Sequence, residues 1–155
     1  MLHTLKVTQL LKSDIQTVWD FMSSPANLEL ITPPGLDLRI LSARDTISDM
    51  HAGQIIEYSV RPFPTLKMHW VTEITHVVPL QYFVDEQRYG PYAFWHHQHS
   101  FKEVPGGTEM TDLLHYRIPF GWIGRLLNSL LIKRQVKNIF DSRFKELEVL
   151  FNDGK

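Results

Sequence analysis

Hydrophobic and polar residues alternate with different periods along the chain, and the changes of period mark its elements. Apolar and β-branched residues over 2–11 predict a first strand. Ser13, with Gln16 three residues later, makes a capping box, and the helical spacing of the apolar residues that follow predicts a short helix. Ser24 before Pro25 predicts a second short helix, because serine favours the N-cap and proline the first helical position.

From residue 36 to residue 118 the hydrophobic period is two, which is typical of strands. The alternation predicts about six of them, at 36–40, 56–60, 66–74, 82–87, 93–103 and 110–118. Proline and glycine separate these strands. We predict Gly106-Gly107 as a two-residue hairpin loop, because glycine accepts the positive φ angles of such turns.

From Trp122 onward the period becomes helical, and one side of the predicted helix is apolar. A helix of about 30 residues is roughly 45 Å long, which is enough to cross a sheet. Its predicted apolar side consists of Leu127, Leu130, Leu131, Val136, Ile139, Phe140, Phe144, Leu147 and Phe151.

The order of these elements predicts an α+β fold. The strands do not alternate with helices long enough to serve as crossovers, so the sheet must be antiparallel. We expect a curved antiparallel sheet of about seven strands wrapped around a long C-terminal helix, with two short helices after the first strand. Because a curved sheet lies at varying distances from a straight helix, we also expect an internal cavity.

Composition supports one ordinary globular domain over residues 1–155, with 43% hydrophobic residues, 21% charged residues and a net charge of -1. Cysteine is absent, which excludes disulfides, thiolate metal sites and thiol catalysis. We expect no signal peptide in the first residues, because they alternate and carry Lys6 and Lys12. Arg125 and Asn128 interrupt the best membrane candidate, 118–132. We therefore expect a cytoplasmic protein without stable membrane insertion.

The second half of the predicted sheet contains a series of distinctive residues, Gly90-Pro91, Trp95 to Phe101, Gly106-Gly107-Thr108, Asp112 and Tyr116 to Gly121. Together with the element order, this series resembles the START-like ligand-binding superfamily, and in particular its bacterial polyketide cyclase/dehydrase-like branch. The resemblance in order covers the whole chain, and the residue-level match lies between about Trp70 and Gly124. It implies the helix-grip fold, and it implies binding of a small molecule, since members bind lipids, hormones or polyketides and only some are catalytic.

A polar cluster is expected inside the sheet. Alternation puts His97 and His99 on one face of their strand, and the predicted hairpin loop makes Asp112 a diagonal neighbour of His99, within hydrogen-bonding reach. We interpret Asp85 and Glu73 as solvated. The residues that we expect to contact a ligand are Trp70, Phe83, Trp95, His97, His99, Asp112 and Tyr116.

Three interpretations of this cluster remain open. In the first, the histidines hydrogen-bond to one another and to nearby hydroxyls, and no ligand is required. In the second, they recognise the polar head group of a ligand, and in the third, they act as general acid and base. The spacing of His97 and His99 also suits two metal ligands, with Asp112 as the third. No fuller ligand set is discernible, so we expect no metal and no cofactor.

The first functional hypothesis is the binding or transport of a small apolar or amphipathic molecule. The alternative is an aromatase/cyclase-type enzyme that acts on a polyketide-like substrate, and a third hypothesis is a regulatory interaction module with a filled core. The basic residues Lys133, Arg134 and Lys137 are interpreted as a solvated helix face, beside which Trp122 and Leu126 form a transient membrane-docking lip. We expect no nucleic-acid binding, and the sequence indicates neither the ligand nor the oligomeric state.

Overall fold

The computed structural model describes residues 1–42, 50–63, 66–119, 121 and 131–153. In this part of the chain seven strands form one antiparallel sheet, as predicted, and their order in the sheet is β1-β7-β6-β5-β4-β3-β2. The strands are β1 (His3–Leu11), β2 (Arg39–Ile40), β3 (Gln54–Phe63), β4 (Leu66–Val78), β5 (Tyr82–Tyr89), β6 (Phe94–Val104) and β7 (Gly107–Arg117). The helices are α1 (Ile15–Met22), α2 (Pro25–Leu28), the 3-10 turn η1 (Pro34–Leu36), α4 (Lys133–Glu148) and the π-helical segment η4 (Val149–Asp153).

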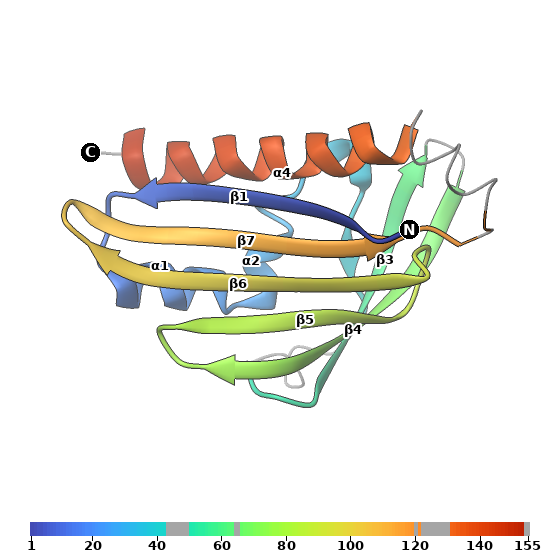
Figure 1. Ribbon diagram of the computed structural model, residues 1–155, viewed down its shortest axis with the longest axis horizontal. Coiled ribbons are helices and arrows are strands. Elements are labelled where there is room, and N and C mark those ends of the chain that lie inside the picture. The colour runs from blue at the N-terminus through green and yellow to red at the C-terminus, as the bar shows by residue number, and fades with distance from the viewer. Residues whose placement is uncertain (43–49, 64–65, 120, 122–130, 154–155) are drawn as a thin grey trace.

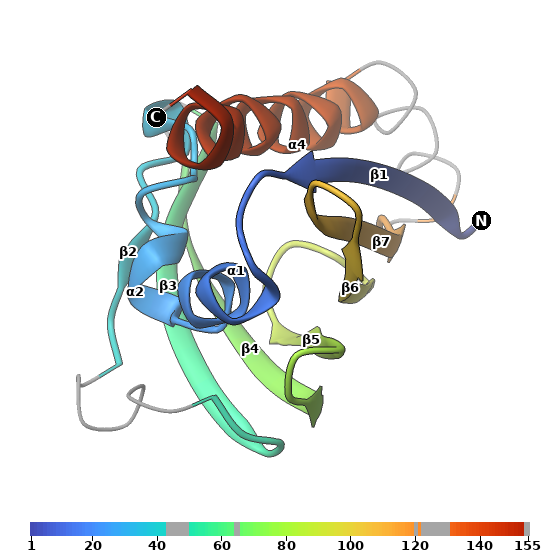
Figure 2. The same cartoon turned by 90° about the vertical axis from the view of Figure 1, so that its left-hand side faces the viewer.

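The sheet is strongly curved, and helices cover its concave side. α4 lies along β1, while α1 packs against β6 and β7 and α2 lies beside β3 in the end-on view (Figures 1 and 2). The register shifts twice along β4 against β5 and once along β3 against β4. Such bulges bend a strand and increase its twist, so they account for part of the curvature. The helix-grip arrangement expected from the sequence is confirmed.

The start of α1 differs from the predicted capping box. Asp14, rather than Ser13, is the N-cap, and its carboxylate accepts hydrogen bonds from the backbone N–H and the hydroxyl of Thr17, at 2.9 and 2.7 Å. Ser13 belongs to the turn that leaves β1, because its own N–H donates to the carbonyl of Leu11. The second start signal is confirmed, since Ser24 is the N-cap of α2 and Pro25 its first residue.

The strand predicted over 36–40 is mostly absent. Leu36 ends the turn η1, Asp37 adopts a left-handed backbone conformation, and only Arg39 and Ile40 pair with β3. The apolar residues of this segment nevertheless pack against the core of β3 and β4 as their alternation indicates. A left-handed residue interrupts the extended backbone that a longer strand requires.

α4 and η4 account for the described part of the long C-terminal helix, while residues 122–130, including the proposed docking lip at Trp122 and Leu126, lie outside the described residues. The buried positions of α4 are Val136, Phe140, Arg143 and Leu147. Phe144, which the sequence places on the apolar side, is partly exposed instead. Arg143 therefore occupies a helix face on which only apolar residues were expected.

Polar side chains at the C-terminal end of the chain bind the backbone and a side chain of β1. The Asn152 amide donates to the carbonyl of Leu10, and its oxygen accepts from the N–H of Lys12. The amide of Gln9 donates to the carbonyl of Phe144 and to the carboxylate of Glu148. These bonds attach α4 and η4 to the outermost strand of the sheet.

The hairpin between β6 and β7 turns one residue earlier than predicted. Val104 pairs with Gly107, so the loop is Pro105-Gly106, and His99 lies directly opposite Asp112 instead of Leu114. Proline followed by a glycine with positive φ suits a type II turn, and Gly106 has φ +92°. Gly107 is already in the strand, where an added Cβ would lie 2.1 Å from the carbonyl oxygen of Leu11.

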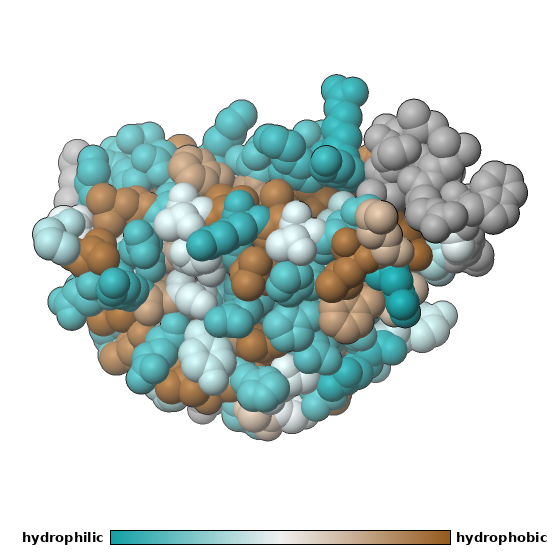
Figure 3. Space-filling model, viewed as in Figure 1, coloured by the Kyte–Doolittle hydropathy of each residue, from teal (hydrophilic) through white to brown (hydrophobic). Residues whose placement is uncertain are grey.

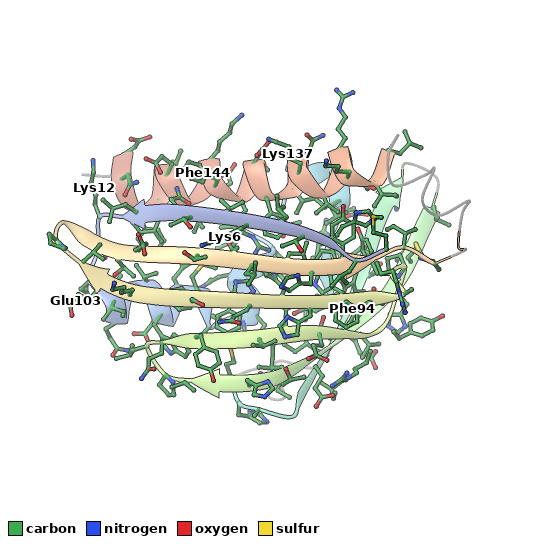
Figure 4. The ribbon with its side chains drawn as sticks, viewed as in Figure 1. Lys6, Lys12, Phe94, Glu103, Lys137 and Phe144 are labelled. Carbon is green, nitrogen blue, oxygen red and sulfur yellow. The ribbon has the colours of Figure 1, made fainter. Side chains whose placement is uncertain are left out.

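The convex face of the sheet presents a mixture of polar and apolar residues (Figure 3). Lys6 on β1 and Phe94 on β6, both labelled in Figure 4, are exposed residues of this face. Among the helices that the structure describes, none combines the length and the apolar character needed to span a membrane.

Candidate functional site

A cavity of about 150 Å³ lies between the sheet, α2 and α4. Its walls are mainly apolar and come from distant segments, among them Leu28, Ile31, Ile56, Val60, Ile74 and Ile139. An apolar cavity of about this volume holds a benzene-sized molecule, and complete ligand pockets run to about 300–1,000 Å³. The space therefore fits one small ring or a short chain without any rearrangement.

An aromatic wall stands on one side of the cavity. Trp70 on β4 meets Trp95 on β6 edge to face, with ring centroids 5.0 Å apart, and Tyr92 packs against both. The indole N–H of Trp70 donates to the hydroxyl of Thr72, so it is satisfied within the protein. The two tryptophans thus present apolar faces to the cavity, with edge-to-face contacts that aromatic pairs prefer.

The polar part of the wall is a group of four side chains, Asp85, His97, His99 and Asp112, which we call the His–Asp cluster. Nε2 of His97 lies 2.9 Å from Oδ1 of Asp112, and Nε2 of His99 lies 2.9 Å from Oδ2 of Asp85, both as hydrogen bonds. Nδ1 of His97 is 3.4 Å from the same oxygen of Asp85. Nδ1 of His99 is 2.8 Å from the same oxygen of Asp112, in a geometry that does not make a hydrogen bond.

One oxygen of each carboxylate in the His–Asp cluster thus contacts both imidazoles. Asp85 lies on the cavity side, because it lines the cavity together with the two histidines. Asp112 lies behind them and lines only a small recess under α4. The two imidazole rings, with centroids 3.8 Å apart, are held between one carboxylate in front and one behind.

The four groups set one another's protonation. Burial opposes ionisation of both carboxyl groups, but the facing imidazoles outweigh burial, and the pKa values of Asp85 and Asp112 lie below their ordinary range. Burial, together with neighbouring His99, lowers the pKa of His97. Burial also disfavours a charge on His99, but Asp112 and Asp85 outweigh burial and raise its pKa. His99 is therefore the histidine that carries a proton more readily.

Arg143 on α4 brings a positive charge to the same end of the cavity. Its side chain is buried, lines the cavity, and lies over the ring of Phe140. Its Nε and Nη1 groups are buried without a hydrogen-bond partner in the described structure. Its charge contributes to the low pKa of Asp85, although less than the two histidines do. Two guanidinium nitrogens beside an apolar cavity are therefore unpaired in the described structure.

Most of the residues that the sequence predicted for ligand contact lie on the cavity. Trp70, Phe83, Trp95, His97 and His99 all line it. Asp112 is set back behind the histidines, while Tyr116 packs with Leu114, Val136 and Phe140 in the core and does not line the cavity. The structure thus brings five of the seven residues to the cavity wall.

Two residues of the site were missed. Asp85 was interpreted as solvated, and this was wrong: its side chain is 18% exposed and binds both histidines. Its position two residues after Phe83 puts it on the same strand face, which is the signal that could have located it. Arg143 follows Phe140 by three residues and precedes Leu147 by four, a spacing that places it on the buried stripe of the helix.

A comparison with family models matches residues 12–140 to a family described as "Polyketide cyclase / dehydrase and lipid transport". The matched segment includes the His–Asp cluster and most of the residues that line the cavity, and it ends within α4 before Arg143. No curated protein sequence matches the chain.

Solved structures share the fold at low sequence identity. Protein CV1439 from Chromobacterium violaceum is 13% identical with a TM-score of 0.72, and the alignment covers 96% of this chain and 97% of that chain. Protein TTHA0849 from Thermus thermophilus is 14% identical, with 94% of both chains covered and a TM-score of 0.71. Ginseng major latex-like protein 151 from Panax ginseng is 11% identical, with 97% and 98% covered and a TM-score of 0.69. Identities this low support the fold alone.

Proposed function

The chain belongs to the polyketide cyclase / dehydrase and lipid transport family, and on that premise we propose that it binds a small amphipathic molecule in the cavity between the sheet and α4. The observation that carries this proposal is the pairing of an apolar cavity with the unpaired, buried donors of Arg143. Ligand pockets combine mostly apolar walls with a few convergent polar groups in this way.

The polar group that suits Arg143 is an oxygen acceptor, and a carboxylate suits it best. A guanidinium presents parallel N–H donors that match the two oxygens of a carboxylate. Leaving such donors buried and unpaired costs free energy, which a bound acceptor would recover. The ligand's apolar part would then lie against Trp70, Trp95 and the aliphatic wall.

The experiment is a calorimetric titration with small aryl and alkyl carboxylates, each paired with the corresponding primary alcohol. We expect the carboxylates to bind more tightly than the alcohols, and Arg143→Met to remove most of that difference while keeping the helix and its packing. Lys145→Met is the matched control, since Lys145 is exposed on the same helix. If neither series binds, or if both variants bind like the unchanged protein, the proposal fails.

The second candidate is a cyclase-type enzyme, and the position of the imidazoles favours it. His97 and His99 both line the cavity and are oriented by carboxylates, as general acids and bases commonly are. Incubation with β-polyketone substrates tests this candidate. An enzyme would lose turnover in His99→Gln with little change in substrate binding, whereas a carrier would show no turnover in either form.

A further inference from the structure

We infer that Asp85, His97 and His99 form a binding site for a divalent transition-metal ion at the polar end of the cavity. Each of these side chains offers one ligand atom, and the three atoms lie within 4.8 Å of one another. Oδ2 of Asp85 is 3.4 Å from Nδ1 of His97 and 2.9 Å from Nε2 of His99. Ligands at about 2.0–2.1 Å in a tetrahedral site stand roughly 3.3 Å apart, and the two distances from Asp85 are already close to this value.

The contacts within the His–Asp cluster support this inference. Two imidazoles make four close contacts with two carboxylate oxygens, at 2.8 to 3.4 Å. Hydrogen bonds account for two of these contacts, His97 Nε2 with Asp112 and His99 Nε2 with Asp85. Nδ1 of His97, 3.4 Å from Oδ2 of Asp85, makes no hydrogen bond in the described structure and can bind a cation on that side.

With an ion in place, every group of the cluster has a consistent role. Nδ1 of His97 and Nε2 of His99 direct their lone pairs at the ion, and their other nitrogens keep their protons. Those other nitrogens are the ones 2.9 and 2.8 Å from Oδ1 of Asp112. A carboxylate that accepts the N–H of metal-binding histidines from behind is the usual support of such sites. Asp112 is thus a positioning residue for His97 through a hydrogen bond, and for His99 through a 2.8 Å contact that becomes a hydrogen bond only when the ring turns.

The three proposed ligands also lie on the cavity side of the His–Asp cluster. Asp85, His97 and His99 line the cavity, whereas Asp112 is behind them, so a remaining coordination position opens toward the cavity. The net charge of the site would be +1, from the carboxylates of Asp85 and Asp112, the guanidinium of Arg143 and a divalent ion. An anionic donor atom from a cavity ligand would complete both the coordination and the charge balance. The inference itself does not depend on such a ligand.

Two histidines and one carboxylate select a borderline ion such as Zn²⁺ or Fe²⁺ over Ca²⁺ or Mg²⁺, which prefer sites made of oxygen ligands. The sequence suggested no metal, and it offered Asp112 as the only third ligand. The register of β5 and β6 supplies the ligand that was missing, because it places Asp85 opposite His97 on the cavity side.

The test uses the full chain, freed of metal by chelation, with Zn²⁺ alone in calorimetry and Co²⁺ alone in visible absorption. We expect one ion per chain, d–d absorption bands of bound Co²⁺, and a rise in the thermal unfolding midpoint with Zn²⁺, because the ion binds the folded chain. Asp85→Asn and His99→Gln should remove the Co²⁺ bands. Asp112→Asn should weaken Zn²⁺ binding roughly 10- to 100-fold.

His96→Gln is the matched control, since His96 lies on the same strand and faces away from the cavity. It should leave stoichiometry and the Co²⁺ spectrum unchanged, and circular dichroism checks that each variant is folded. Binding that survives Asp85→Asn and His99→Gln in folded protein would mean that exposed histidines take the ion, and the inference would be overturned. Absence of any binding to the unchanged protein would overturn it as well. Neither result bears on the carboxylate titrations above.

Discussion

The concave side of the sheet has two regions that differ in how completely they are filled. Under α1, Trp19 stands edge to face on both Phe83 and Phe101, with ring centroids 6.0 and 5.5 Å apart, and Leu11 and Leu147 are fully buried beside them. We call this region the filled half. The cavity half, between α2, β3, β4 and α4, keeps about 150 Å³ open.

The two halves share one sheet, so the difference comes from what covers it. α1 places a tryptophan directly against the sheet, whereas the cavity half is covered by the four-residue helix α2 and by side chains of α4. Dispersion contacts are lost wherever a gap remains, so an open space lowers stability. Stability is therefore concentrated in the filled half, and the cavity half is left for binding.

Removing the central aromatic residue of the filled half should have the largest effect. Trp19→Ala deletes both edge-to-face contacts and leaves a void, and we expect a loss of about 3–5 kcal/mol in the free energy of unfolding. Urea denaturation measures it. Phe94→Ala, at an exposed aromatic residue of the convex face, is the control and should cost far less. Equal losses would show that Trp19 is not central to the core.

The same substitution, valine to phenylalanine, should destabilise the filled half more than the cavity half. Val18 on α1 is fully buried, so Val18→Phe overpacks the filled half and should cost about 1–3 kcal/mol. Val60 lines the cavity, so Val60→Phe has room for its ring and should cost less. It should also abolish binding of the aryl carboxylates. Equal destabilisation of the two variants would contradict an open cavity.

The helix that completes the filled half should respond weakly to loss of its cap. The hydrogen bonds from the backbone and side chain of Thr17 lower the pKa of Asp14, so the folded state favours its charged form. The contribution is therefore complete above the ordinary pKa of 3.8 and disappears as pH falls through the lower folded value.

We expect Asp14→Ala to lower the thermal midpoint by a few degrees at pH 7, and the difference from the unchanged protein to vanish in strong acid. Asp14→Asn, which keeps a capping oxygen, should show little loss at either pH. Scanning calorimetry across pH measures both variants. A difference that grows toward acid would contradict the assignment of the cap.

Local patterns in the sequence predicted the elements well, because periodicity and start signals act over a few residues. The predicted first strand corresponds to β1, five of the six period-two stretches correspond to β3–β7, and Ser24-Pro25 begins α2 as expected. The prediction of a strand over 36–40 was wrong because Asp37 adopts a left-handed backbone conformation. The neighbouring residues give no signal of that conformation. Ser13 and Asp14 both suit an N-cap, and the turn after β1 decides between them.

The site was predicted less completely, because it depends on pairing between strands. A one-residue shift of the loop from Gly106-Gly107 to Pro105-Gly106 moves the pairing by two residues, which preserves the faces but changes the partners. His97 and His99 were therefore placed on the correct face with the wrong neighbours. Asp85 on β5 and Arg143 on α4 lie on the same cavity as the two histidines. No local sequence pattern shows that these elements come close to one another.

The hydrogen bonds between the C-terminal segment and β1 also protect the chain against self-association. β1 is one of the two outer strands of the sheet, and an unprotected outer strand can pair with the sheet of another molecule. Asn152 occupies the carbonyl of Leu10 and the N–H of Lys12, and at the opposite edge Glu29 accepts the N–H of the two-residue strand β2 at Ile40. Trimming the last turn after Leu150 would therefore expose a template for strand exchange, and the shortened chain would aggregate before it lost its fold.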